Sequence, residues 1–327
     1  MAWTNRRVLV TGAGGFIGSH LAERLTGAGA ITRALVRYTS SGSRGWLDSS
    51  PAKADVEVLA GDICDREILA RAMQGVDTVF HLAALIGIPY SYDAPASYVR
   101  TNVEGTLAVL QVARAAGVRR VVHTSTSEVY GSAIRVPIDE DHPLHTQSPY
   151  AASKASADLM AMSFQRAFGA EIVTVRPFNT YGPRQSARAV IPTIITQALG
   201  GSAIRLGNLS PTRDFLYVRD TVEGFVCAAD AANVAGRTFN LGTGQDISIG
   251  DLARTIQSLL GTDLPVLTDD VRERPAASEV DRLCADASAA RTAFGWSPKH
   301  DLADGLRQTI AWMKDHLERY RIDAYSI

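Results

Sequence analysis

The sequence predicts an α/β protein with a doubly wound parallel sheet and a smaller mixed α/β domain in its C-terminal half. Short apolar runs alternate with helical patterns through the first half of the 327 residues. After Pro177 the pattern changes, because glycine and proline become frequent and short strands mix with helices. We therefore expect the sheet domain in residues 1–177 and the second domain mainly in residues 178–327, with some later segments returning to the sheet.

Hydrophobic periodicity gives the elements in order. Buried strands are expected at residues 8–10, 31–36, 56–59, 78–82, 119–124 and 172–176. Helices are expected at residues 16–27, 95–116 and 149–168, and the second of these places Val99, Val103, Leu107 and Leu110 on one face. The second half predicts a strand at 238–241 and helices near 191–199, 221–232 and 249–259, whereas the serine-rich stretch 39–43 predicts a loop.

The composition argues against several classes of function. Apolar residues make up 46% of the chain, charged residues 20%, and the net charge is −1. Such a balance provides no field that would attract nucleic acid or anionic lipid. The three cysteines, Cys64, Cys227 and Cys284, lie far apart without metal-ligand spacing, so we expect mostly buried thiols, no metal site and no disulfide framework. No long apolar segment indicates a signal peptide or a membrane span, which predicts a cytoplasmic protein.

A glycine-rich turn follows the first predicted strand and opens the first predicted helix. Gly12, Gly15 and Gly18 have the spacing GxxGxxG, and Phe16 and Ile17 begin the helix. Small residues allow backbone amides to approach a pyrophosphate closely, and the helix N-terminus adds partial positive charge. Three glycines also form ordinary turns, but this position between strand and helix favours a Rossmann site for NAD or NADP.

The end of the second predicted strand bears on the choice between the two dinucleotides. NAD sites usually place an acid there for the ribose 2′-hydroxyl. This chain has Arg37 instead, with Ser40, Ser41 and Arg44 nearby. These groups suit a 2′-phosphate and favour NADP, although a solvated loop with two surface arginines is the alternative. The other residues expected along the dinucleotide are Asp62 and Ile63 near the adenine, Leu82, Ala83 and Ala84 toward the nicotinamide, and Thr124 and Pro177.

Tyr150 and Lys154 lie four residues apart in a helical segment, so their side chains share one face. A phenol is a weak base at neutral pH, and a nearby ammonium is expected to lower its pKa. The pair could then accept a hydroxyl proton as a hydride leaves the same carbon. Thr126, Ser127 and Glu128 follow a central strand, where such sheets place their chemistry. Glu128 could make a second proton transfer, or it could be only a capping or surface carboxylate.

Together these motifs resemble the extended short-chain dehydrogenase/reductase superfamily, from Gly12 to the helix near Trp312. Within it the chain is most similar to nucleotide-sugar 4,6-dehydratases, and among those to the hexosamine dehydratases of the legionaminic-acid pathway. The segments that carry this resemblance are residues 88–92, 179–188 and 206–215, the pair Arg274-Pro275, and residues 294–298.

The resemblance implies a reaction sequence. Tyr150 takes the proton of the sugar 4-hydroxyl while hydride leaves C4, and Thr126 hydrogen-bonds the 4-oxygen. Glu128 removes the C5 proton, water leaves from C6, and returning hydride gives a 4-keto-6-deoxy sugar. Glucose-type dehydratases carry Thr-Asp-Glu at this triplet, whereas this chain has Ser127, a poor proton donor. Glu128 would then serve as both base and acid.

Three other functions fit parts of the pattern. A UDP-glucuronate decarboxylase oxidises C4 and loses carbon dioxide from C5, and the triplet does not separate it from a dehydratase. A nucleotide-sugar 4-epimerase needs no Glu128, because hydride returns to the same C4. A non-catalytic NADP-binding sensor is the remote alternative, since such proteins commonly lose the tyrosine or the lysine and both are present here.

The resemblance also implies substrate contacts and a partner. The substrate-binding candidates are Tyr90, Asn179, Val190, Arg213 and Arg274, and the two arginines would clamp a diphosphate. Arg184 and Arg188 are further candidates. The helices at 95–116 and 149–168 would pair across a twofold axis into a homodimer; alternatively, their apolar faces only cover the sheet.

Overall fold

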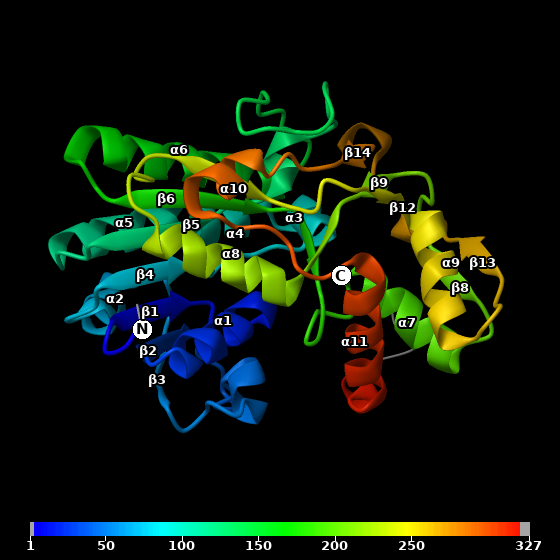
Figure 1. Ribbon diagram of the computed structural model, residues 1–327, viewed down its shortest axis with the longest axis horizontal. Coiled ribbons are helices and arrows are strands. Elements are labelled where there is room, and N and C mark those ends of the chain that lie inside the picture. Colours follow the sequence, from blue (N-terminus) through cyan, green and yellow to red (C-terminus); the bar gives the residue numbers. More distant parts are fainter. Residues whose placement is uncertain (1–2, 321–327) are drawn as a thin grey trace.

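Seven parallel strands form the central sheet of the computed structural model, which describes residues 3–320 (Figure 1). Their order is β11-β6-β5-β4-β1-β2-β3, and all six pairings are parallel. The strands are β1 (Arg7–Thr11), β2 (Ile31–Val36), β3 (Val56–Ala60), β4 (Thr78–His81), β5 (Arg120–Thr124), β6 (Ile172–Pro177) and β11 (Thr238–Leu241). The strand order reverses between β1 and β4, and ligands bind beside such a point in doubly wound sheets.

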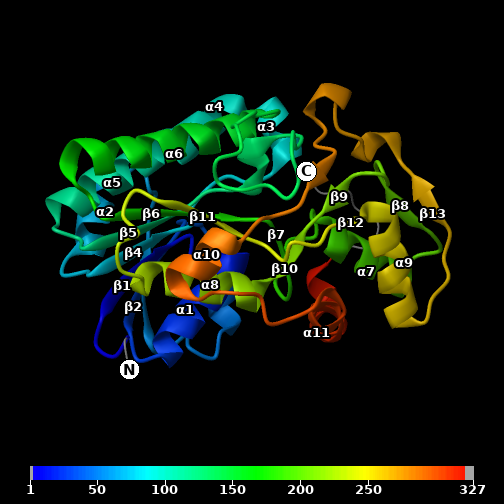
Figure 2. The same cartoon turned by 45° about the horizontal axis from the view of Figure 1, so that its top comes forward.

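Helices cover both faces of this sheet (Figure 2). One face carries α1 (Phe16–Gly27), α8 (Val218–Asp230) and α10 (Ser288–Phe294), and the other carries α2 (Arg66–Met73), α5 (Gly105–Ala115) and α6 (Pro149–Phe168). The predicted fold class is therefore confirmed. β11, α8 and α10 all come from beyond residue 177, so the chain returns to the sheet after leaving it.

A second region lies beyond the carboxyl ends of the strands (Figure 1). Its short strands pair as β7 (Asn179–Tyr181) with β10 (Phe215–Tyr217), β8 (Ile204–Leu206) with β13 (Val266–Thr268), and β9 (Thr212–Arg213) with β12 (Ile247–Ser248) and β14 (Arg282–Leu283). Its helices are α7 (Val190–Gly200), α9 (Ile249–Leu260) and α11 (Leu302–Lys314). One apolar cluster runs from Val10 and Val175 in the main sheet to Ile194 and Ile256 in this region, so the two share a core.

The predicted helix at 95–116 is interrupted. It consists of α4 (Pro95–Tyr98), a π-helical segment η2 (Val99–Glu104) and α5, preceded by α3 (Ile88–Asp93). The π segment changes the angular phase of the chain, so the predicted apolar face is wrong in its first half. Val99 is 51% exposed, whereas Asn102 and Thr106 are buried.

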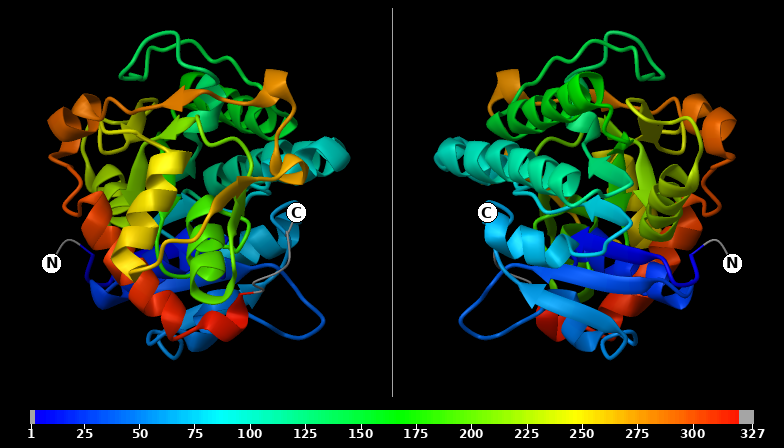
Figure 3. Two further views of the ribbon diagram at one scale, coloured as in Figure 1. Left: turned by 90° about the vertical axis from the view of Figure 1, so that its right-hand side faces the viewer. Right: turned by 90° about the vertical axis from the view of Figure 1, so that its left-hand side faces the viewer.

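Short helical turns complete the chain: η1 (Gly45–Ser49), η3 (Ser127–Tyr130), η4 (Asp270–Arg272), η5 (Ala276–Ser278) and η6 (Leu317–Arg319). The segment between η3 and α6 projects from the body of the molecule (Figure 3). Cys284 is buried but Cys64 and Cys227 are only half-buried, which corrects the expectation for the thiols. No helix within residues 3–320 is long and apolar enough to cross a membrane. The same residues contain no cluster of side chains suited to hold a metal ion.

Candidate active site

The candidate residues predicted from the sequence line one cleft, apart from Ser40, Ser41 and Arg184. It has a volume of about 1350 Å³ and lies where the carboxyl ends of the parallel strands meet the second region. The dinucleotide candidates on its wall are Gly12, Gly15, Phe16, Ile17, Gly18, Arg37, Asp62, Ile63, Leu82, Ala83, Ala84, Thr124 and Pro177. The catalytic candidates there are Thr126, Ser127, Glu128, Tyr150 and Lys154, and the substrate candidates are Tyr90, Asn179, Val190, Arg213 and Arg274.

The glycine turn is shaped for close backbone approach. Gly12 has a φ of 71°, and a Cβ atom there would lie 2.8 Å from the amide nitrogen of Ala83. Gly18 packs on the carbonyl of Gly12, so a side chain at Gly18 would collide with it. α1 begins at Phe16 with Gly15 as its N-cap, and no side chain caps its first amides. The amides at this helix start border the cleft and fit a pyrophosphate.

Thr124 gives an independent indication that this half of the cleft fits a ligand. Its Oγ1 atom is buried and has no hydrogen-bond partner within residues 3–320. Buried polar atoms nearly always have partners, so a ligand hydroxyl is a natural one here. Asp62 is less free than expected, because its Oδ1 already accepts a hydrogen bond from the amide of Cys64 at 2.8 Å. Taken together, the turn and the orphaned hydroxyl fit a nicotinamide dinucleotide.

Tyr150 and Lys154 project from the first turns of α6 into the cleft. The helix begins directly after Ser148, whose hydroxyl caps its first turn. The two side chains are buried, with exposed fractions of 7% for the tyrosine and 4% for the lysine. Nζ of Lys154 donates to the carbonyl oxygen of Thr124 at 2.6 Å. The helix start is thereby fixed against the end of β5.

The η3 turn places the triplet beside the phenol. Thr126, Ser127 and Glu128 are all buried directly after β5. The hydroxyl of Thr126 accepts a hydrogen bond from the amide of Glu128 at 3.3 Å. Both a hydrogen bond with Thr126 and the charge of Glu128 act on the phenol of Tyr150. The cleft therefore holds two groups that can move protons next to each other.

Burial sets the protonation of the catalytic pair. It raises the pKa of Tyr150; a hydrogen bond with Thr126 opposes this, and the charge of Glu128 adds to it. This direction is opposite to the lowered pKa expected from the sequence, because the loss of hydration outweighs the favourable contacts. Burial also lowers the pKa of Lys154 to about 8, and the charge of Asp158 opposes that change. At neutral pH the phenol keeps its proton and the lysine is mostly charged.

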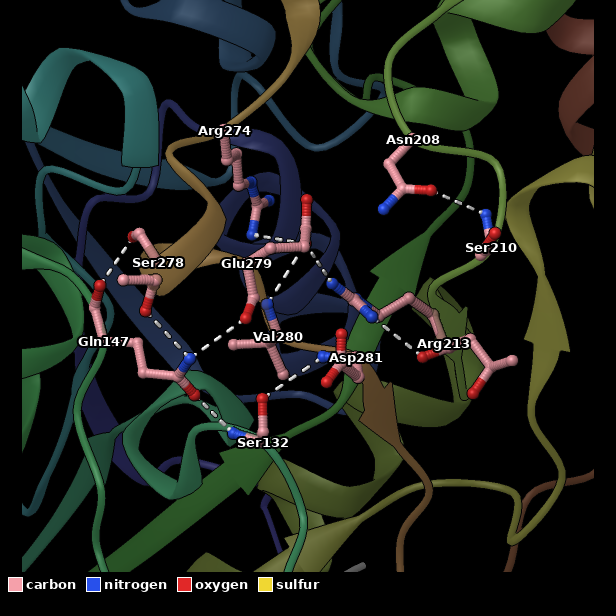
Figure 4. Close-up of polar contacts among 12 residues, drawn as sticks. Ser132, Gln147, Asn208, Ser210, Arg213, Arg274, Ser278, Glu279, Val280 and Asp281 are labelled. Atoms are coloured by element: carbon pink, nitrogen blue, oxygen red, sulfur yellow. Dashed lines mark hydrogen bonds and ion pairs between the residues drawn. The ribbon is translucent and has the colours of Figure 1, made fainter.

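Two arginines surround a carboxylate at the far side of the cleft (Figure 4). Arg213 is 5% exposed, and its Nη2 lies 3.1 Å from Oε1 of Glu279. Nη1 of Arg274 lies 3.7 Å from the same oxygen. The charge of Glu128 also acts on Arg213, so this arginine clamp borders the catalytic triplet. The structure thus brings the predicted diphosphate clamp together but adds an acid between its arms.

The other substrate candidates differ in their surroundings. Oδ1 of Asn179 is buried without a hydrogen-bond partner within the described part of the chain, which leaves it for a ligand. Tyr90 is 41% exposed on the cleft wall. Arg188 also lines the cleft. Arg184, by contrast, donates to Glu23 on α1 at 2.8 Å and braces the second region against that helix.

Three residues that organise the site were missed in the sequence: Glu279, Gln147 and Asp158. Gln147 donates to the carbonyls of Ala277 and Glu279 at 3.1 and 3.0 Å, across separations of 130 and 132 positions (Figure 4). No local spacing reveals such contacts. The nearest signals were the position of Gln147 just before the catalytic helix and that of Glu279 just after Arg274.

Known proteins resemble this chain over most of its length. Residues 9–309 match the family described as GDP-mannose 4,6 dehydratase. A dTDP-glucose 4,6-dehydratase of Streptomyces griseus is 37% identical over 94% of this chain and 94% of that protein. A UDP-glucose 4-epimerase of Mycolicibacterium smegmatis is 35% identical over 94% of this chain and 99% of its own. The crystal structure of a dTDP-glucose 4,6-dehydratase from Streptomyces venezuelae with NAD bound has a TM-score of 0.87 at 33% identity, covering 96% of this chain and 99% of that one.

Proposed function

Because the chain belongs to the GDP-mannose 4,6 dehydratase family of extended short-chain dehydrogenases/reductases, we propose that it is a nicotinamide-dependent nucleotide-sugar 4,6-dehydratase. The product would be a 4-keto-6-deoxy sugar still attached to its nucleotide. The observation that carries the proposal is Glu128, buried in the cleft close enough for its charge to act on Tyr150. Elimination of water needs a second proton-transfer group, whereas return of a hydride to C4 does not.

The first half of the reaction belongs to Tyr150 and Lys154. A bound dinucleotide supplies hydride acceptance at C4 and hydride return at C6. Tyr150 acts through its minor, ionised form: this phenolate takes the proton of the 4-hydroxyl, and Thr126 donates a hydrogen bond to the same oxygen. Burial disfavours that phenolate, and we propose that the charge of Lys154, on the same helix face, stabilises it.

The second half belongs to Glu128. The 4-ketone makes the C5 hydrogen acidic, and the carboxylate of Glu128 removes it. Ser127 orients the departing 6-hydroxyl, and Glu128 returns its proton to that oxygen as water leaves. One proton is taken and one is given, so the carboxylate ends as it began. Once hydride has added to C6, C5 takes a proton from solvent, and the proton that Tyr150 removed from the 4-hydroxyl passes to solvent, which balances the reaction.

The rival reactions make different demands on Glu128 and on Arg213. An epimerase is supported by the 35% identical relative, but it gives Glu128 no task. A decarboxylase needs a cation free to bind a uronate carboxylate near C5. Arg213 is the arginine that acts on Glu128, and in this proposal it is already assigned to the diphosphate. The dehydratase therefore accounts for the arrangement best.

The test incubates the purified protein with a panel of nucleotide sugars in heavy water and follows each by mass spectrometry. A dehydratase gives a product lighter by one water that carries deuterium at C5. Loss of carbon dioxide from a uronate, or an unchanged mass with altered stereochemistry at C4, would overturn the proposal in favour of a decarboxylase or an epimerase. Turnover abolished in Tyr150→Phe would assign the observed reaction to this site.

We also propose that NADP is the preferred dinucleotide. Arg37 and Arg44 line the adenosine end of the cleft, where an NAD site usually has an acid. The test compares NADP and NAD affinity by calorimetry in the natural chain and in Arg37→Ala/Arg44→Ala. Weaker binding of NADP alone in the variant supports the proposal, whereas tighter binding of NAD than NADP by the natural chain refutes it.

A homodimer and a cytosolic location complete the proposal. Val99 and Leu159, on the two helical segments predicted to pair, are 51% and 54% exposed. Apolar side chains exposed on neighbouring helices suit a second copy of the chain. Sedimentation should show a dimer that dissociates in Leu159→Glu, and a natural chain that sediments as a monomer would contradict this part.

A further inference from the structure

A second buried polar layer lies directly behind the catalytic pair. α6 continues one turn beyond Lys154 to Asp158, so the two side chains share a face of the helix. Asp158 is 6% exposed, and neither the proposed proton transfers nor the substrate contacts use it. A buried carboxylate is costly unless it is paired and hydrogen-bonded, so its partners show what it does.

Asp158 binds both sides of the strand end that holds the lysine. Its Oδ1 lies 3.0 Å from Nε2 of His123, and its Oδ2 accepts from the hydroxyl of Ser125 at 2.6 Å. These two residues flank Thr124, whose carbonyl accepts the hydrogen bond of Lys154. The carboxylate therefore fixes the β5 end against the same helix that carries the lysine.

A third partner comes from the next strand. Nε and Nη2 of Arg176 on β6 donate to Oδ2 of Asp158 at 3.1 and 2.9 Å. Burial alone would raise the pKa of Asp158, but the contacts with His123, Arg176 and Ser125 lower it to about 2. Because an ionised carboxylate only accepts hydrogen bonds, Nε2 of His123 carries a proton. The carboxylate is thus charged throughout the working pH range.

The charged groups around Lys154 show why the ionised state of Asp158 matters. The titratable groups on the elements around it are Tyr150 and Asp158 on α6, His81 on β4, His123 on β5, Glu128 on η3 and Arg176 on β6. Burial lowers the pKa of His81 and of His123, so both rings are neutral near pH 7. The charges of Glu128 and Asp158 both raise the pKa of the phenol. Asp158 is the carboxylate whose charge acts on the lysine.

We propose that Asp158 is a positioning residue for this reaction, whose buried carboxylate keeps Lys154 charged and holds it against the end of β5. The inference rests on the proposed function, because it assigns the lysine its role beside Tyr150. Asp158 touches no reacting atom, and its charge raises the pKa of both Lys154 and Tyr150. Without its charge the lysine would lose its proton at a lower pH, and the phenolate would lose its counter-ion.

The lysine can be titrated directly without any substrate. The chain contains four lysines, Lys53, Lys154, Lys299 and Lys314, so ε-13C-lysine labelling gives few NMR signals. The signal lost in Lys154→Arg identifies the catalytic one. In Asp158→Asn, which keeps the shape and removes the charge, we expect its titration midpoint to fall by at least about one pH unit.

Arg176→Gln is the matched variant. It disrupts the same buried layer but removes a positive charge beside the carboxylate of Asp158. The titration midpoint of Lys154 should therefore rise. A purely structural role would move both variants in the same direction or in neither. Midpoints that agree with that of the natural chain in both variants would overturn the inference. If Asp158→Asn does not fold, an unchanged or lowered midpoint in Arg176→Gln alone overturns it.

The pH profile of hydride transfer gives the kinetic counterpart. The charged fraction of the lysine is lost as pH rises through its pKa, so the alkaline limb should move to lower pH in Asp158→Asn and to higher pH in Arg176→Gln. A natural chain inactive on every nucleotide sugar would refute the proposed function, but the NMR midpoints would still decide the role of Asp158.

Discussion

The catalytic region and the arginine clamp face each other across one cleft but are built in different ways. The catalytic side chains extend from β5, η3 and α6, whose backbones belong to the central sheet and its covering layer. The clamp extends from the two-residue strand β9 and the turn around η5. Tyr150 and Lys154 are at most 7% exposed. In the clamp Arg213 is as deeply buried, at 5%, but the side chains of Arg274 and Glu279 are 27% and 16% exposed.

This difference separates two physical tasks. A group that moves a proton must be held in one geometry and shielded from water, which a continuous sheet and a buried polar layer provide. A group that binds a diphosphate must admit and release an anion, so partial exposure and an exchangeable acidic partner suit it. Glu279 pairs with Arg213 and Arg274, the two arginines proposed to bind the phosphates. We therefore expect substitutions in the first region to act on turnover and those in the second to act on affinity.

Tyr150→Phe should have the largest effect, because it removes the proton acceptor of the catalytic region. Removing one oxygen deletes the proton acceptor, and positioned proton transfer contributes about 100- to 10,000-fold. We expect turnover with the accepted nucleotide sugar to fall by about 1,000-fold or more, while calorimetry shows unchanged dinucleotide affinity. A loss of affinity without a loss of turnover would show that the tyrosine belongs with the binding residues.

Glu128→Gln should stop the reaction after the oxidation at C4 and before the elimination of water. The amide cannot take the C5 proton, so we expect product formation to fall by about 100- to 1,000-fold. Oxidation at C4 needs only the Tyr150–Lys154 pair, so reduced nicotinamide should accumulate and be visible by absorbance. Glu67→Gln, on the exposed start of α2, serves as control. Full turnover in Glu128→Gln would assign the site to an epimerase.

The same contrast explains what could be predicted from the sequence. The glycine turn, the Tyr150–Lys154 pair and the triplet ending in Glu128 are local patterns, and their elements fold where periodicity placed them. α1 and α6 have the predicted bounds because each begins at a sequence-readable start and ends beside a glycine. The fold class follows from the same alternation of strand and helix.

The rest depends on contacts between distant residues. Glu279 and Gln147 matter through partners that no spacing reveals, and Asp158 matters through strands on both sides of its helix. The raised pKa of Tyr150 also escaped prediction, because it comes from burial, which the pair of residue types does not show. The π segment at Val99 changed a helix face for which the sequence pattern gave no warning.

Substitutions in the clamp should test the other side of the comparison. Arg213→Gln removes a nearly buried cation, and a charge-assisted hydrogen bond contributes about 1.5–3 kcal/mol, so KM should rise about 10- to 100-fold. Arg274→Gln should raise it about 3- to 10-fold, because solvent screens the more exposed side chain. Inhibition by the free nucleoside diphosphate should weaken in parallel, with kcat changed by less than about threefold. A large fall in kcat at normal KM would erase the distinction between the two regions.

The smallest expected effect concerns the link between them. Gln147 stands just before the catalytic helix, accepts from the amide of Ser132, and donates to the carbonyls of Ala277 and Glu279 beside the clamp. Gln147→Ala removes these three bonds at about 0.5–1.5 kcal/mol each, so the free energy of unfolding should fall by about 1.5–4.5 kcal/mol in urea. The clamp turn loses two hydrogen bonds but keeps the one from Ser278 to the backbone carbonyl of residue 147, and the helix of Tyr150 keeps its Ser148 cap. KM should therefore rise about threefold and kcat should hold. Gln74→Ala, at the exposed end of α2, is the matched control and should change neither. If kcat falls as KM rises, the clamp and the catalytic helix move as one unit through this side chain, and the two regions differ in composition but not in function.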